Sequence, residues 1–354
     1  MLGYQTLRPF LFKTNPETAH TMIETLGKIA PKIPTLLPLL SYRHCINDSI
    51  LNQEIDGMRF YNPVGLAAGF DKNATMIESL CAFGFSHLEL GAVTPLAQSG
   101  NDKPRLWRHI QEESIQNAMG FNNEGMNVVN ARLKSLSPFA IPLGVNIGKN
   151  KATPQEEALK DYLTLAQNFT QTSDYLSVNL SSPNTPNLRE LQNNDFIQEL
   201  LGKICEVYPK PIYLKIAPDL EIDSALGLIE AAISSGAKGI IATNTTLDYS
   251  LVAQPQDKGG ISGKVLAPKS REMLKQIALM LKGKNQKTTL ISVGGIADAQ
   301  EAYARIRLGA NLVQVFSALI FEGPSLVRKI NLELKNYLER DGFNHIGEAI
   351  GVDL

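Results

Sequence analysis

The chain has 354 residues, of which 44% are hydrophobic, and this length suits either one barrel-sized domain or two ordinary domains. Its formal net charge is -1, with Lys and Arg scattered along the chain, so nothing in the composition suggests a nucleic-acid partner. Three cysteines, Cys45, Cys81 and Cys205, are odd in number and far apart, which argues against a disulfide framework or a zinc site and favours a reducing compartment.

The N-terminal segment, residues 1–46, is predicted to form a small helical subdomain. Asn15 and Pro16 are typical of a helix start, and apolar residues then recur at steps of three and four from Ala19 to Ile29. Prolines in the stretch IPTLLPLLSY, from Ile33, prevent one long helix but leave an apolar surface. This surface either covers the rest of the fold or meets a membrane or a hydrophobic substrate.

Neither a secretory signal nor a membrane span is predicted. The first residues lack a charged start followed by an apolar run, and no stretch approaches the ~18 apolar residues that cross a bilayer. The protein is therefore expected to be soluble, or at most to rest on a membrane surface.

A β-hairpin is predicted next, from Ile50 to Pro63, with its turn at Asp56 and Gly57. A boundary with the N-terminal segment is placed near Cys45 to Asp48. Residues 47–354 are therefore expected to form the second and larger domain.

Eight short apolar runs follow in regular order, and each ends in small or polar residues. Such near-continuous runs are typical of strands buried on both faces of a parallel sheet, and segments with helical periodicity lie between most of them. An α/β fold with a (β/α)8 barrel is therefore predicted. A doubly wound open sheet is the alternative, but its Gly-x-Gly-x-x-Gly fingerprint is missing. The runs are VGLAAGF from Val64, LELGAVT from Leu88, LGVNIG from Leu143, YLSVNLS from Tyr175, IYLKIAP from Ile212, GIIATNT from Gly239, LISVGGI from Leu290 and LVQVFSAL from Leu312.

The stretch GGISGK, Gly259 to Lys264, fails as a nucleotide-binding phosphate loop. Val265 stands where Ser or Thr is required, and Lys258 stands where the first Gly is required. We expect a flexible Gly-rich loop here, after the sixth strand, that contacts a cofactor.

Polar residues at the ends of the eight runs are candidates for an active site, because barrels of this kind build their sites there. Amides and lysines dominate the set, with one acid and no clustered histidines, which argues against a catalytic metal and against paired-carboxylate hydrolysis. The set comprises Gly69, Asp71, Lys72, Asn146, Asn179, Ser182, Asn184, Lys215, Asn244, Thr245, Gly294, Gly295 and Ser317.

Three features of the sequence indicate the ligand. Gly295 and Ser317 follow the last two runs, where such barrels commonly bind a phosphate. Lys215 lies within a strand, so it must meet a negative charge, which a ligand that becomes anionic during the reaction would supply. The amides of Asn117, Asn179, Asn184 and Asn244 suit a planar ring with N–H and C=O groups.

Ser182 is not flanked by the Gly-x-Ser-x-Gly sequence that exposes a nucleophilic serine in hydrolases.

Nine sequence blocks resemble those of the dihydroorotate dehydrogenases, in particular the quinone-dependent class 2 branch. Class 1 members carry a cysteine base where Ser182 stands and lack the N-terminal helices. The resemblance implies an FMN flavoprotein, an oxidoreductase that converts dihydroorotate to orotate in de novo pyrimidine (UMP) biosynthesis. The blocks are GLAAGFDKN from Gly65, NAMGFNNEG from Asn117, GVNIGKN from Gly144, NLSSPNTPNLR from Asn179, LKIAPD from Leu214, IATNTT from Ile241, GGISG from Gly259, VGGI from Val293 and VQVFSALIFEGP from Val313.

The resemblance also implies the contacts of each ligand. Ala92 and Phe316 depart from the family pattern, which has Thr and Tyr there, so hydroxyl contacts are lost at both positions. FMN contacts are expected from Ala68, Gly69, Phe70, Asp71, Lys72, Ala92, Asn146, Asn179, Lys215, Thr243, Gly263, Gly295, Phe316 and Ser317. Contacts with the substrate are expected from Lys72, Asn117, Ala118, Met119, Gly120, Phe121, Asn179, Asn184, Asn244 and Thr245.

The implied mechanism uses Ser182 as the general base, and no metal. A membrane quinone would reoxidise FMN after entering between the N-terminal helices and the barrel, on a protein bound peripherally to the cytoplasmic side of a bacterial inner membrane. One alternative is a class 1-type dihydroorotate or dihydropyrimidine oxidoreductase with a soluble acceptor. Two others are a non-catalytic phosphate-ligand binder and a lyase that uses Lys215 as a Schiff base.

Overall fold

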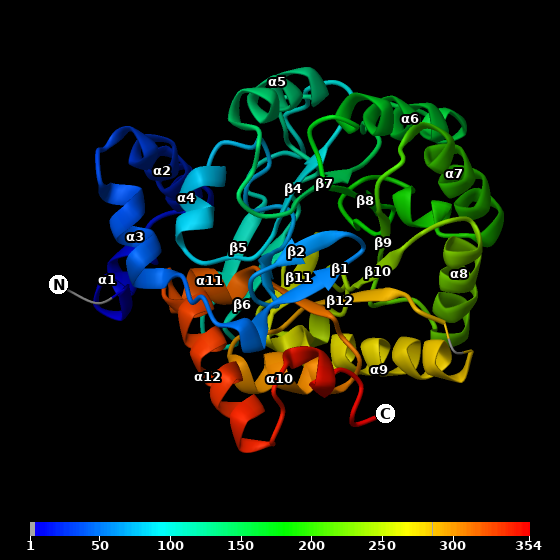
Figure 1. The fold of residues 1–354 in the computed structure, drawn as a ribbon. Helices are drawn as coiled ribbons and strands as arrows, with labels where there is room; N and C mark the ends of the chain where they lie inside the picture. The colour runs from blue at the N-terminus through cyan, green and yellow to red at the C-terminus, as the bar shows by residue number, and fades with distance from the viewer. Residues whose placement is uncertain (1–3, 285) are drawn as a thin grey trace.

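A computed structural model describes residues 4–284 and 286–354 and shows a closed barrel of eight parallel strands (Figure 1). The order around the barrel is β10-β12-β13-β3-β4-β7-β8-β9, closing on β10. Seven of the eight predicted apolar runs contain a whole barrel strand, and the run from Leu290 covers all of β12 except its first residue, Thr289, so the predicted (β/α)8 fold is confirmed. The strands are β3 (Val64–Leu66), β4 (Leu88–Val93), β7 (Leu143–Ile147), β8 (Tyr175–Asn179), β9 (Ile212–Ile216), β10 (Gly239–Ala242), β12 (Thr289–Val293) and β13 (Leu312–Val315).

Helices surround the barrel and bury one face each against it (Figure 1). In α8, for example, Ala225, Leu228, Ile229 and Ala232 are buried at helical spacing. The helices are α4 (Ile77–Ala82), α5 (Met126–Leu136), α6 (Ala158–Phe169), α7 (Asn194–Val207), α8 (Ile222–Ser234), α9 (Ala267–Gly283), α10 (Ala299–Arg307), α11 (Ser317–Glu322) and α12 (Leu326–Arg340). Short 3-10 turns are η1 (Ala30–Lys32), η2 (Ser49–Leu51), η3 (Gln155–Glu157), η4 (Leu188–Leu191), η5 (Tyr249–Leu251), η6 (Lys264–Leu266) and η7 (Ile346–Ala349).

The predicted hairpin is present as β1 (Gln53–Ile55) and β2 (Met58–Phe60), and its Phe60 packs in one apolar cluster with Tyr175 and Tyr213 of the barrel. Asp56 and Gly57 have φ of +51° and +76°, as the turn of a two-residue hairpin requires. Asp56 accepts hydrogen bonds from Tyr213 Oη at 2.7 Å and from Thr289 Oγ1 at 2.8 Å. Both partners lie near the amino ends of their strands, so the carboxyl ends are left for a ligand.

The N-terminal helices α1 (Tyr4–Leu11), α2 (Pro16–Ile29) and α3 (Leu36–His44) lie to one side of the barrel, with α3 beside α4 and α1 beside α11 (Figure 1). The predicted start of α2 is confirmed, because Asn15 Oδ1 accepts hydrogen bonds from the N–H groups of Glu17 and Thr18. Leu26 and Leu39, which belong to the predicted apolar surface, remain 63% and 59% exposed, so part of that surface is not covered by the barrel. Phe10 of α1 is also exposed, at 67%.

A second sheet lies outside the barrel and consists of β5 (Leu106–His109), β6 (Ser114–Asn117) and β11 (Gly260–Gly263). The expectation of a flexible loop at Gly259 to Lys264 is wrong here, because β11 pairs antiparallel with β6 from Gly260 opposite Asn117. Glycine is needed at position 259, since an added Cβ would lie 2.3 Å from the Asn117 carbonyl oxygen. A segment that looked like a loop is therefore an ordered strand beside the site.

Candidate active site

A cavity of about 730 Å³ lies at the carboxyl ends of the barrel strands, where (β/α)8 enzymes place their active sites. Strand ends contribute polar lining residues such as Asn146 and Asn179, whereas α1 and α2 contribute apolar ones such as Leu7 and Ile23. One continuous space therefore connects the polar end of the barrel with the N-terminal helices.

An ion pair between Lys215 and Glu89 is buried in the barrel beneath this cavity. Lys215 on β9 and Glu89 on β4 have side chains that are 6% and 0% exposed, and the lysine Nζ lies 3.2 Å from Glu89 Oε1. From the sequence we expected an anionic ligand to balance this lysine, but the protein supplies a carboxylate itself. Glu89 was missed because it stands in the apolar run LELGAV, where nothing indicates a partner three strands away.

Glu89 has hydrogen-bond partners on two further strands. Asn146 Nδ2 donates to its Oε1 at 2.7 Å, and Gln314 Nε2 donates to its Oε2 at 2.8 Å. Burial alone raises the pKa of Glu89, but the charge of Lys215 and the amide donors outweigh burial and hold the pKa below its usual range. Glu89 is therefore a carboxylate at neutral pH.

The predicted asparagines form two hydrogen-bonded sets around the cavity. Asn179 Nδ2 donates to Asn146 Oδ1 at 3.0 Å, and its own Oδ1 accepts from Asn244 Nδ2 at 3.3 Å. Separately, Asn184 Nδ2 donates to Asn117 Oδ1 at 3.1 Å. Amides from parts of the chain that are far apart in sequence thus line one space.

Ser182 lies in the loop after β8 and is 5% exposed at the cavity wall. Its Oγ accepts a hydrogen bond from the Asn184 N–H at 3.2 Å, which leaves the hydroxyl proton free to be donated. Asn101 Nδ2 donates to the Asn184 carbonyl at 2.9 Å and connects the loop to the segment after β4. The serine is therefore held by its own loop rather than exposed on a nucleophile turn.

The loop after β6 brings Met119, Gly120 and Phe121 to the cavity. Gln98 Nε2 donates to the carbonyls of Gly120 and Phe121 at 3.1 and 3.2 Å. Phe121 has a φ of +54°, which is uncommon for a residue with a side chain and persists only where surrounding contacts enforce it. Gly148 leaves room for the ring, because an added Cβ there would lie 2.7 Å from it.

A glycine turn after β12 and the start of α11 present backbone donors to the cavity. Gly295 has a φ of +81°, and an added Cβ would lie 2.4 Å from the Ala267 nitrogen, so only glycine fits. The N–H groups of Gly295 and Ser317 donate to no residue within 4–284 and 286–354. Arg305, which is fully buried, donates to the Gly294 carbonyl at 3.0 Å and fixes the turn. These free donors suit a phosphate.

The loop after β3 forms the side of the cavity nearest α2. Phe70 packs edge to face against Phe316, with ring centroids 5.9 Å apart, and its carbonyl accepts a hydrogen bond from His20 Nε2 at 2.8 Å. Lys72 lines the same cavity, and burial lowers the pKa of its ammonium to about 8. In the part of the chain that the structure describes, this ammonium has no hydrogen-bond partner, so it can receive an anionic ligand.

Two predicted site residues lie away from the cavity. Asp71 accepts hydrogen bonds from the N–H groups of Thr75 and Met76 and shapes its own loop. Ala118 is buried, and its N–H donates to the Arg105 carbonyl. The other predicted residues line the cavity: Ala68, Gly69, Phe70, Lys72, Ala92, Asn117, Met119, Gly120, Phe121, Asn146, Asn179, Ser182, Asn184, Lys215, Thr243, Asn244, Thr245, Gly263, Gly295, Phe316 and Ser317.

Three further lining residues, Tyr4, His20 and Arg108, were not singled out from the sequence. Burial, together with the nearby charge of Lys72, lowers the pKa of His20 to about 4, so its imidazole is neutral at pH 7. His20 directly follows Ala19 on the apolar side of α2. This position was the one indication in the sequence that His20 faces the cavity.

The cavity wall combines amide side chains, lysine ammonium groups and backbone N–H groups. Within 4–284 and 286–354, no group of three or more His, Cys, Asp or Glu side chains is arranged to hold a metal ion. Asparagine amides, two lysines and free backbone N–H groups are the available chemistry, on a (β/α)8 scaffold. These features define a (β/α)8-barrel protein with a polar cavity at the carboxyl ends of its strands.

Comparisons with known proteins identify the family. The family model for dihydroorotate dehydrogenase matches residues 50–338. A dihydroorotate dehydrogenase (quinone) from a Nitratiruptor species is 52% identical over 353 residues, covering 100% of both chains, and one from Helicobacter acinonychis is 49% identical, covering 99% of both. The chain belongs to the dihydroorotate dehydrogenase family, a family of flavin-dependent oxidoreductases.

Solved structures agree with this assignment across the whole chain. The crystal structure of DHODH from Eimeria tenella in complex with ferulenol superposes with a TM-score of 0.87 at 32% identity, covering 98% of both chains. Its ligand-free counterpart also gives a TM-score of 0.87, at 34% identity, covering 96% of this chain and 99% of the other. The N-terminal helices are therefore part of the shared architecture.

Replacing Glu89 by Gln should destabilise the protein strongly, because it leaves the Lys215 ammonium buried beside a neutral amide. Removing one partner of a buried pair typically costs about 3–5 kcal/mol. The change should appear as a lower thermal unfolding temperature. Glu89→Gln combined with Lys215→Met should recover part of the loss, and an unfolding temperature equal to wild type in the single variant would contradict a structural role for the pair.

Proposed function

We propose that the chain oxidises dihydroorotate to orotate, using FMN as cofactor and a membrane quinone as electron acceptor. The observation that carries the proposal is the cavity, which contains Ser182 and Lys215 at its polar end and continues to the N-terminal helices. The names of the relatives, dihydroorotate dehydrogenase (quinone), support the same substrate and acceptor.

The residues present fit FMN. The free N–H groups of Gly295 and Ser317 would hold its phosphate, and Gly263 lies in the same part of the cavity wall. Lys215 and the carboxamide of Asn179 would meet the polar edge of the ring system, with Ala92 and Phe316 in packing contact only. When bound, FMN supplies the hydride acceptor for the oxidation.

The carboxylate of the substrate would bind Lys72, whose ammonium has no partner among the described residues. The ring would lie among Asn117, Asn184 and Asn244, each of which offers both a donor and an acceptor. Thr245 Oγ1 is buried and unpaired within the described chain, which suits a further hydrogen bond to the same ligand. These contacts would fix the orientation in which the reaction proceeds.

Ser182 would accept the proton from C5 of dihydroorotate as a hydride leaves C6, so that a C5=C6 double bond forms. A serine hydroxyl has a very high pKa, so it must pass its own proton onward as it receives another. Thr185, buried in the same loop, is the candidate that we assign to that relay, through a water molecule. Lys215 would stabilise the negative charge that develops on the cofactor side.

The quinone would enter between α1, α2 and the barrel, where Tyr4, His20 and Arg108 line the cavity. Exposed apolar residues of the N-terminal helices, among them Phe10 and Leu39, would rest on the cytoplasmic side of a bacterial inner membrane. No helix in residues 4–284 or 286–354 has the length and apolar character of a membrane span. Peripheral contact through these side chains is therefore the proposed mode of attachment.

Replacing Ser182 by Ala should slow flavin reduction by dihydroorotate by about 10²–10⁴-fold, the usual contribution of a general base. FMN should remain bound at wild-type stoichiometry, because the lost hydroxyl makes no predicted contact with the cofactor. Rapid anaerobic mixing measures the rate, and the absorbance spectrum measures FMN content. Loss of FMN, or an unchanged rate, would contradict the role as base.

The affinity for orotate should fall as the pH rises through about 8. Lys72 is charged below its pKa of about 8 and neutral above it, and a carboxylate binds only the charged form. The dissociation constant, followed by flavin absorbance, should be constant from pH 6 to 7 and rise by up to about tenfold per unit above 8. Lys72→Gln should bind weakly with no such rise, and a wild-type affinity that strengthens with pH would refute the assignment.

A double variant, Phe10→Ser with Leu39→Asp, should weaken membrane binding without changing flavin reduction. Each buried apolar side chain contributes about 1.5–3 kcal/mol, so losing two should lower the vesicle-bound fraction at least about tenfold. Sedimentation with phosphatidylcholine and phosphatidylglycerol vesicles measures this fraction. Leu332→Asp, at an exposed position of α12, is the control. An equal loss of vesicle binding in both proteins would show that the N-terminal helices are not the specific membrane-binding face.

A further inference from the structure

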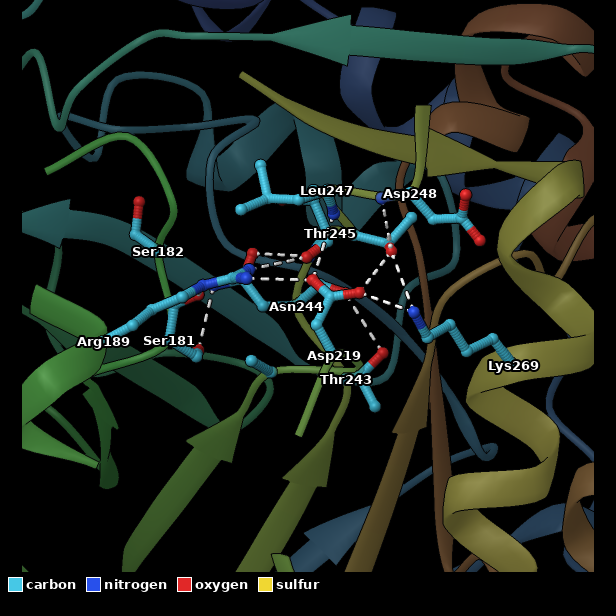
Figure 2. Close-up of polar contacts among 12 residues, drawn as sticks. Ser181, Ser182, Arg189, Asp219, Thr243, Asn244, Thr245, Leu247, Asp248 and Lys269 are labelled. Atoms are coloured by element: carbon cyan, nitrogen blue, oxygen red, sulfur yellow. Dashed lines mark hydrogen bonds and ion pairs between the residues drawn. The ribbon is translucent and has the colours of Figure 1, made fainter. Parts of the chain in front are cut away.

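Asp219, three residues after β9, accepts four hydrogen bonds from three separate parts of the chain (Figure 2). Lys269 Nζ on α9 donates to its Oδ1 at 2.6 Å, and Thr246 Oγ1 donates to the same oxygen. Arg189 Nη1 and the Leu247 N–H donate to Oδ2 at 2.9 and 3.0 Å. Figure 2 shows Arg189 and Lys269 reaching the carboxylate from opposite sides.

Arg189, in η4, connects this carboxylate to the loop that carries Ser182. Its Nε donates at 2.9 Å to the carbonyl of Ser181, which belongs to the peptide joining Ser181 to Ser182. Its Nη2 donates at 2.9 Å to the carbonyl of Thr245, in the loop after β10. One guanidinium thus fixes two loops that line the site, and Asp219 fixes the guanidinium.

Neither Arg189 nor Asp219 lines the cavity, so neither can act by touching a ligand there. Both side chains are 21% exposed. Burial by itself raises the pKa of Asp219, but hydrogen bonds from Lys269, Thr246 and Arg189 outweigh it and keep the pKa below its usual range. The carboxylate is therefore charged at neutral pH and holds Arg189 by a charge-assisted hydrogen bond.

The loop needs an external anchor because its own sequence gives little regular structure. Pro183 and Pro186 cannot donate backbone hydrogen bonds, and Asn187 has a φ of +58°. The hydroxyl of Ser181 is buried and accepts a hydrogen bond from Asn244 Nδ2 at 3.0 Å, whereas its carbonyl accepts from Arg189. The direction of the Ser181–Ser182 peptide thus depends on the guanidinium.

We propose that Asp219 is a positioning residue for the reaction, acting through Arg189 to hold the Ser181–Ser182 peptide and the Thr245 carbonyl so that Ser182 Oγ faces the substrate. This inference rests on the proposed role of Ser182 as base. Displacements of about 1 Å at a reacting group can cost on the order of 10²-fold in rate, so loss of the anchor should be visible in the chemical step.

The test uses Asp219→Asn and Arg189→Lys in the FMN-loaded protein. A carboxamide at position 219 cannot accept from all four donors, and lysine keeps the charge of Arg189 but not its fork of N–H groups. Both variants should reduce flavin about 10–100-fold more slowly with dihydroorotate, while FMN content stays at wild type and orotate affinity changes less than about threefold. If Asp219→Asn fails to fold or bind FMN, Arg189→Lys carries the same prediction.

The matched control is Asp341→Asn. Asp341 is 23% exposed and pairs with Arg307 and Arg340, but it lies by the carboxyl end of α10, at the other end of the barrel from the site. This variant should keep the wild-type rate of flavin reduction. A loss as large as that of Asp219→Asn would overturn the proposal, because any aspartate paired with arginine would then have the same effect.

Combination with Ser182→Ala decides whether Asp219 acts through the base. If it does, adding Asp219→Asn to Ser182→Ala should slow flavin reduction by less than about threefold, since groups that act as a unit are not additive. A further loss equal to that in the wild-type background would overturn the positioning role. If Ser182→Ala alone keeps the wild-type rate, the proposed base fails, whereas wild-type rates in Asp219→Asn and Arg189→Lys with a slow Ser182→Ala refute only the positioning role.

Discussion

The buried pair of Glu89 and Lys215 is the constraint around which the site is organised. Charges inside a barrel are costly unless each is paired and hydrogen-bonded. Glu89 meets both conditions by accepting from Lys215, Asn146 and Gln314, which stand on β9, β7 and β13. Four strands of the barrel are thereby held in register by one carboxylate, with the ammonium fixed beneath the cavity.

Polar residues above this pair form connected layers. The Asn146 amide that donates to Glu89 also accepts from Asn179, and Asn179 accepts from Asn244. Asn244 in turn donates to Ser181, next to the proposed base. A continuous set of hydrogen bonds therefore leads from the barrel interior to the Ser182 loop, and the pair of Arg189 and Asp219 fastens that loop from outside.

Much of the fold could be predicted from the sequence, because apolar runs mark barrel strands, and Asp56–Gly57 and Asn15–Pro16 mark a turn and a helix start. Strand β11, which begins at Gly260, could not be predicted from the sequence. It pairs with β6, which is far away in the chain, and its glycines are typical of a loop. The sequence also did not reveal that Glu89 and Asp219 each accept hydrogen bonds from several separate segments. Their partners lie far away in sequence, and a single acid in an apolar run or after a strand carries no sign of them.

The residues that the family pattern names on strand ends line the cavity, whereas two that it names in loops do not. Asp71 and Ala118 adjoin true lining residues in sequence, but their groups turn to backbone partners instead. His20 on α2 and Arg108 on β5 reach the cavity from outside the barrel, and neither belongs to one of the eight predicted apolar runs. Whether each of these residues lines the cavity depends on the tertiary structure and not on the local sequence.

Anaerobic mixing of the purified yellow protein with dihydroorotate, followed by addition of one acceptor at a time, tests both halves of the proposed reaction. Dihydroorotate should bleach the flavin absorbance, and a membrane quinone should restore it rapidly, whereas fumarate and NAD should not. A protein that purifies without flavin, or a flavin that fumarate or NAD reoxidises faster than quinone, would contradict the proposed function.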